Sequence, residues 1–203
     1  MDELRPGTYT MGPPGGTVAV RTLREGLAAR VGHDLVMELT RWRATLTVPE
    51  SGSERPHLSA TLETRSLTVR EGKGGAMPLS EKDIADITRN AFDKVLQVDA
   101  HPEIAFESTL VGPVEAGRIA VAGTLTLVGV ARPVRFSGQV TEVDGQTRIT
   151  ATIPIVQSEW GIKPFRAFMG ALKVRDEVDV HLDIGVPAAP DSTDGAASPP
   201  AAQ

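Results

Sequence analysis

The sequence RIAVAGTLTLVGVARPVRFSGQV, residues 118–140, decides what kind of fold this chain can form. Apolar side chains recur at spacing two in residues 119–127, and the alternation resumes after a break at residues 129–133. A period of two puts one set of side chains on one face of a strand, and Gly129 permits the positive φ of a tight turn. Pro133 lacks an N–H group and disfavours helix at the residue before it. The stretch therefore predicts a β-hairpin with one apolar and one polar face.

Composition limits the classes of protein that the chain can belong to. Its 203 residues carry a net charge of −5 and include no cysteine. An acidic chain without a clustered excess of Lys and Arg is unsuited to nucleic acid, and the missing cysteine excludes disulfides, thiolate metal sites and cysteine nucleophiles. The first residues are polar, and no run approaches the roughly 18 apolar residues of a membrane-spanning helix. We therefore expect a cytoplasmic protein with no membrane span and no nucleic-acid partner.

Strand patterns also occur outside the hairpin, at residues 8–11, 17–23, 35–48, 58–69, 103–111, 147–156 and 174–184. In residues 35–48 the alternation slips by one near Thr40 and Arg41, which predicts a bulge or a corner. Residues 80–96 instead place apolar side chains at helical spacing, and Ser80 with Asp83 resembles a capping box. We expect one amphipathic helix there, and because its apolar face must pack on something, it should cover an open end of the sheet.

The chain divides into one folded domain, residues 1–187, and a tail, residues 188–203. The tail is rich in Pro, Ala and Ser and has no large apolar residue, so it cannot repay the entropy cost of ordering. We expect it to be disordered. The antiparallel strands of the domain fit either a β-sandwich or a closed barrel, and the pattern alone does not choose between them.

Four motifs carry a resemblance: GTLTLVGVARPVRF at 123–136, HPEIAFEST at 101–109, RVGHDL at 30–35 and SEWGI at 158–162. Together they resemble the YceI-like family. The resemblance implies an all-β fold, an eight-stranded antiparallel lipocalin-like barrel with one inserted helix. It also implies a non-enzymatic protein that can form a homodimer. Such a protein binds an isoprenoid lipid, either a polyisoprenoid or an isoprenoid quinone, in an apolar tunnel for carriage, storage or stress protection. Val128 departs from the family pattern, in which members often carry His.

Candidate lipid contacts come from the inner faces of the expected strands. Period-two counting puts Phe106 and Phe136 on the same inner face as Leu110. The aromatic group in residues 158–172 lies outside a regular strand, so it can belong to the core or line a cavity mouth. His33 can contact a polar head group or simply stabilise a turn. The expected ligand-binding residues are Val20, Phe106, Leu125, Phe136, Ile149, Ile153, Trp160, Phe165, Phe168 and His33.

Two other functions fit the sequence. His33 and Asp34 could serve a small hydrolase or isomerase at the barrel mouth, although neighbours on a strand point to opposite faces. A barrel filled by its own side chains would instead make a structural or interaction protein. The sequence contains no nucleophile elbow, nucleotide-binding loop or close pair of histidines. We therefore expect no catalytic residue, no metal site and no cofactor.

Overall fold

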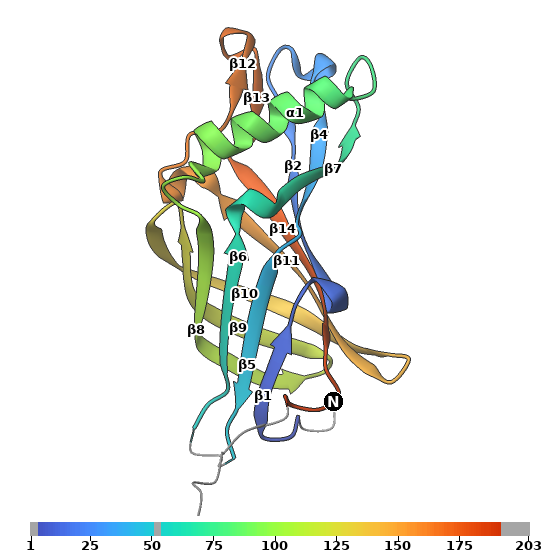
Figure 1. Ribbon diagram of the computed structural model, residues 1–203, viewed down its shortest axis with the longest axis vertical. Coiled ribbons are helices and arrows are strands. Elements are labelled where there is room, and N and C mark those ends of the chain that lie inside the picture. The colour runs from blue at the N-terminus through green and yellow to red at the C-terminus, as the bar shows by residue number, and fades with distance from the viewer. Residues whose placement is uncertain (1–3, 51–53, 192–203) are drawn as a thin grey trace, which may run out of the picture.

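The computed structural model describes residues 4–50 and 54–191, which form a curled antiparallel sheet of eleven strands and a small three-stranded sheet (Figure 1). The large sheet has the order β1 (Gly7–Met11), β5 (Trp42–Val48), β6 (His57–Glu63), β8 (Glu103–Glu115), β9 (Arg118–Leu127), β10 (Val130–Val143), β11 (Gln146–Val156), β14 (Glu177–Val186), β2 (Gly16–Thr22), β4 (Asp34–Leu39) and β7 (Leu67–Lys73). The small sheet contains β12 (Arg166–Ala167), β13 (Leu172–Val174) and β3 (Arg24–Glu25). The all-β prediction is confirmed, but the large sheet has eleven strands where eight were expected.

Two corners account for part of this difference. The slip predicted at Thr40 and Arg41 is confirmed as a corner, because β4 ends before it and β5 begins after it. The neighbouring strand, predicted to be continuous over residues 58–69, is divided into β6 and β7 by the 3-10 turn η3 (Thr64–Ser66). The Ser66 hydroxyl accepts a hydrogen bond from the Arg41 N–H at 3.0 Å, which ties the two corners together. On one side of the corners β4 pairs with β7, and on the other side β5 pairs with β6. These two pairs lie near opposite ends of the strand order, so the chain that runs through both corners connects the ends and curls the sheet.

The hairpin predicted from residues 118–140 is confirmed, since β9 and β10 pair from Arg118↔Gln139 to Leu127↔Val130. Among the described residues, three two-residue hairpin turns have positive φ at both positions, and the turn of this hairpin is one of them: Ala116 (48°) with Gly117 (72°), Val128 (49°) with Gly129 (72°), and Asp144 (51°) with Gly145 (75°). Such turns match the right-handed twist of the strands they join.

Replacing Ala116 with Asn should stabilise the fold by about 0.5–1 kcal/mol. Asn tolerates the left-handed region that costs Ala free energy, and Asn-Gly is the preferred pair for this kind of turn. Ala116 is exposed, so the change removes no packing. Urea unfolding of the variant and its parent measures the gain, and Asp144→Ala, which introduces the same defect at another turn, should lose a similar amount.

The predicted helix is confirmed as α1 (Glu81–Asn90), which continues as the π-helix η4 (Ala91–Leu96). Its capping box is complete: the Asp83 N–H donates to the Ser80 hydroxyl at 3.2 Å, and the Ser80 N–H donates to an Asp83 carboxylate oxygen at 2.9 Å. The hydrogen bond from the Ser80 side chain is the main cause that lowers the pKa of Asp83. The helix lies across one end of the curled sheet, and Ile87 and Phe92 pack against the core (Figure 1).

Leu110 was expected on the inner face of the sheet, but it lies on the other face. The register of β8 against β9 shifts between Ser108 and Leu110, so Leu110 is 38% exposed and Val111 takes the buried position. A bulge reverses the alternation, and the sequence pattern did not show it.

The start of the expected tail, residues 188–191, lies against β1. The Asp191 N–H donates to the Thr8 carbonyl at 2.6 Å, and its carboxylate accepts a hydrogen bond from Thr10 at 2.6 Å. The prediction of a disordered tail therefore concerns mainly residues 192–203, and these lie outside the described residues. Within the described part of the chain, every helix is too short or too polar to cross a bilayer.

Candidate functional site

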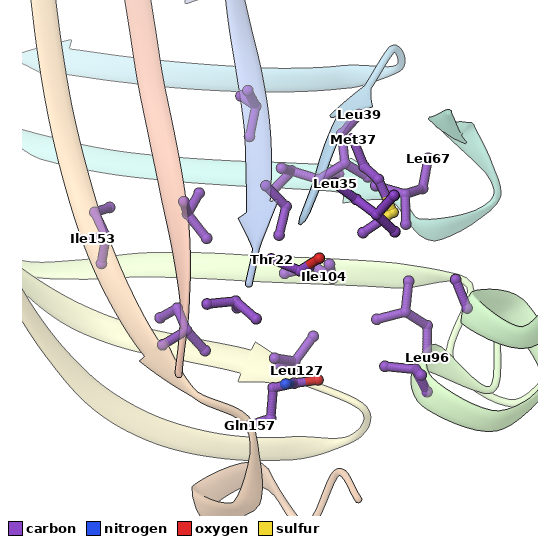
Figure 2. Close-up of a pocket in the computed structure, with 18 of the residues that line it drawn as sticks. Thr22, Leu35, Met37, Leu39, Leu67, Leu96, Ile104, Leu127, Ile153 and Gln157 are labelled. Atoms are coloured by element: carbon purple, nitrogen blue, oxygen red, sulfur yellow. The ribbon is translucent and has the colours of Figure 1, made fainter. Parts of the chain in front are cut away.

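A cavity of about 970 Å³ lies inside the curled sheet. This volume is near the upper end of the roughly 300–1,000 Å³ typical of ligand pockets. Most of the side chains that face the cavity are aliphatic or aromatic (Figure 2). Those labelled in the close-up include Leu35, Met37, Leu39, Leu67, Leu127 and Ile153.

Two features of the sequence create this space. The alternation along β14 turns Val178, Val180, Leu182 and Ile184 into the cavity. Across the strands, a row of directly paired residues runs from Met11 through Ala44 and Ala60 to Phe106. Two adjacent alanines on the inner face leave the middle of this row without large side chains. The inner face is therefore apolar but does not fill its own interior.

The polar residues that line the cavity include two buried ones, Thr22 and Gln157, each 6% exposed (Figure 2). The Gln157 amide nitrogen donates to the carbonyls of Arg175 at 2.9 Å and Asp176 at 3.3 Å, so the amide oxygen is directed away from them. The Thr22 hydroxyl is buried and has no hydrogen-bond partner among the described residues. Alternation along β2 could have identified Thr22, whereas no sequence signal pointed to Gln157.

Charged and polar side chains line the cavity near α1 and the loops beside it. They are Arg24, His33, Asp83, Asp86, Asn90 and Lys173. Figure 1 shows α1 and β13, two of the elements that carry them, at the same end of the molecule. The cavity is thus polar toward this end and apolar along the inner faces of the strands.

The sequence of residues 17–186 matches the YceI-like domain. The chain belongs to the YceI-like family. A search of curated proteins found no match to the sequence.

Similar solved structures agree with this family and its fold. Burkholderia cenocepacia BcnA matches with a TM-score of 0.58 at 16% identity, over 84% of this chain and 96% of that chain. A polyisoprenoid binding domain from Saccharophagus degradans, implicated in plant cell wall breakdown, matches with a TM-score of 0.57 at 10% identity, over 90% and 98%. A Campylobacter jejuni YceI protein matches with a TM-score of 0.51 at 13% identity, over 73% and 82%. At these identities the likeness shows the YceI-like fold alone.

The YceI-like fold places nearly all of the expected ligand-binding residues around the cavity. Phe106 and Phe136 lie on the same inner face, as period-two counting predicted, with ring centroids 6.1 Å apart and ring planes tilted by 57°. Phe165 and Phe168 lie toward the polar end. The expected residues that line the cavity are Val20, Phe106, Leu125, Phe136, Ile149, Ile153, Phe165, Phe168 and His33.

Trp160 is the exception, because it belongs to the wall of the YceI-like domain and does not face the cavity. It is 3% exposed, and its indole N–H donates to the Leu125 carbonyl at 3.2 Å. β10 and β11 pair only as far as Gln139↔Thr150, and the 3-10 turn η5 (Gln157–Trp160) packs against β10. The indole therefore packs where these two strands separate. Of the two roles that the sequence allowed for this aromatic group, Trp160 takes the core role, and we propose no ligand contact for it.

The side chains of His33 and Asp34 bond to different partners in this YceI-like domain. The His33 Nε2 donates to the Met77 carbonyl at 2.8 Å, while the Asp34 carboxylate accepts the Arg24 N–H at 2.9 Å. Each side chain holds a different loop in place. Among residues 4–50 and 54–191, no three His, Asp or Glu side chains are gathered as metal ligands would be.

Proposed function

We propose that this protein binds an isoprenoid lipid, a polyisoprenoid or an isoprenoid quinone, without catalysing a reaction on it. The apolar cavity is the observation that carries the proposal. A cavity of about 970 Å³ lies near the upper end of the range for ligand pockets, so it has room for a chain of several isoprene units. A longer chain would extend through the polar end.

The distribution of polar groups supports one orientation of the ligand. Each buried methylene contributes about 0.8 kcal/mol, so the chain gains most along the aliphatic inner faces of the strands. A polar head group gains nothing there and would lose its hydrogen bonds to water. We therefore place the head group toward α1, where Gln157 offers a hydrogen-bond acceptor and Arg24 and Lys173 offer charge.

Two observations favour this function over its rivals. A structural barrel packed with its own side chains would not contain a cavity of this size, since protein interiors are close-packed. A hydrolase or isomerase would need His33 and Asp34 to converge on a substrate, and each instead holds its own loop. The similar fold of the Saccharophagus degradans polyisoprenoid binding domain supports the same class of ligand. Carriage, storage and stress protection are the roles that such binding would serve.

Native mass spectrometry of the gently purified full chain, with organic extraction of the same sample, tests the proposal. We expect a non-covalent adduct whose extracted mass and fragmentation match a polyprenyl chain, with or without a quinone ring. An apo protein that also fails to take up an added isoprenoid would overturn the proposal. Recovery of a fatty acid or a phospholipid in place of an isoprenoid would also contradict it.

A further inference from the structure

Three neighbouring loops at the polar end of the cavity, residues 24–33, 72–79 and 162–174, expose large apolar side chains. We call these loops the rim. Leu27 and Met169 are fully exposed, Met77 is 76% exposed, Phe168 66% and Val31 51%. Single exposed apolar residues are ordinary on a protein surface, but a group of them indicates an interaction site. We propose that the rim docks on the surface of a bilayer that contains anionic lipids.

Hydrogen bonds join the three loops into one surface. The Ala28 N–H donates to the Ala171 carbonyl at 2.9 Å, which ties the loop of Leu27 to the turn that carries Phe168 and Met169. The Arg24 guanidinium donates to the Lys73 carbonyl at 2.7 Å. His33 holds the Met77 carbonyl. Figure 1 shows these segments together at the end of the molecule where β12, β13 and α1 lie.

The charge of the rim is opposite to that of the whole chain. Its basic residues are Arg24, Arg30, Lys73, Lys163, Arg166 and Lys173, and the acidic residue within its bounds is Glu25. Three further carboxylates lie beside it: Glu71, which pairs with Lys73 at 3.2 Å, and Asp83 and Asp86 of α1. The rim therefore carries six positive charges and one negative charge, a net +5, and it remains positive at +2 when the three neighbouring carboxylates are counted, in a chain whose net charge is −5. Apolar side chains surrounded by Lys and Arg match an anionic lipid surface, where each basic residue contributes about 1 kcal/mol of attraction.

The same charge argues against a second copy of the chain as the occupant. A symmetric dimer through this surface would bring two rims of net +5 together, and like charges across an interface are unfavourable. An anionic bilayer instead neutralises them.

The rim is continuous with the cavity, since Val31, Met77 and Phe168 also line it. A docked rim would let an apolar chain pass between bilayer and cavity without crossing water. Continuity with the cavity therefore gives the exposed apolar side chains a role in ligand transfer, which scattered surface residues would not have.

The turn between β12 and β13 shows strain at its most exposed point. Phe168 and Met169 have φ angles of 50° and 53°, a region that bulky residues rarely occupy. Asn and Gly would fit this backbone better, so the large apolar side chains are present at a cost in stability. Such a cost is typical of functional sites.

Co-sedimentation with vesicles tests the proposal, using phosphatidylcholine alone and equal parts of phosphatidylcholine and phosphatidylglycerol. The parent chain should bind the anionic vesicles and leave the neutral ones largely unbound. The double variant Phe168→Asn with Met169→Gly relieves the strained turn, so it should fold at least as well while its vesicle affinity falls at least about tenfold. The double variant Arg30→Glu with Arg166→Glu should lose the preference for phosphatidylglycerol.

Val143→Asn is the matched control, because Val143 is 47% exposed beside the β10–β11 turn, away from the rim (Figure 1). It should leave vesicle binding unchanged. No binding by the parent chain to either vesicle would overturn the proposal, as would a dimer in light scattering that the Phe168 and Met169 changes dissociate. These vesicles contain no isoprenoid, so the result does not depend on what fills the cavity, and isoprenoid uptake from detergent is measured separately.

Discussion

Ala60→Phe is expected to remove most of the affinity for an isoprenoid while the protein stays folded. Ala60 lines the cavity in the middle of β6, paired with Ala44 on one side and Phe106 on the other. A phenyl ring there would occupy cavity space that the lipid chain needs. If it displaces about four methylene groups, the loss is about 3 kcal/mol, or roughly two hundredfold in Kd.

Stability should not fall with the affinity, because the ring enters existing space and does not overpack a filled core. Ala120→Phe is the control: Ala120 is exposed on β9, and the same change there should leave the affinity as it was. Isoprenoid titration and urea unfolding are measured on both delipidated variants. A folded Ala60→Phe protein with the parent's affinity would show that the lipid does not occupy this cavity.

Trp160→Ala is expected to destabilise the fold by about 3–5 kcal/mol, the usual cost of deleting a large aromatic side chain from a core. Trp160 is buried with Leu127, Ile155 and Val178, and its N–H is satisfied by the Leu125 carbonyl. The variant would leave a hole in the wall where β10 and β11 separate.

Phe165→Ala provides the comparison, because Phe165 lines the cavity and is only partly buried. It should cost clearly less in the delipidated protein than the roughly 3–5 kcal/mol of a core aromatic residue, since its ring is not enclosed by core on all sides. Urea unfolding midpoints of both variants separate the two roles. Similar small losses for both would contradict the assignment of Trp160 to the wall.

Local patterns were enough to predict α1 and the segments that form the large sheet, but not the small sheet of β3, β12 and β13. Alternation at period two identified the strands, Gly129 the turn between β9 and β10, and Ser80 with Asp83 the start of α1. These features depend on neighbours two to four residues apart, so the sequence contains them directly. The same reasoning missed the bulge before Leu110 and the 3-10 turn η3, because neither leaves a mark in the alternation.

The sequence by itself determined that the chain forms antiparallel strands with one apolar face, and its motifs determined the family. Only the tertiary structure decided that this face surrounds a cavity, because the space depends on Ala44 and Ala60 meeting across strands. It also decided that Trp160 closes the wall, since that role follows from where β10 and β11 part. The basic rim could not be predicted from the sequence either. Its charges come from three segments that are far apart along the chain, and only folding brings them to one end of the molecule.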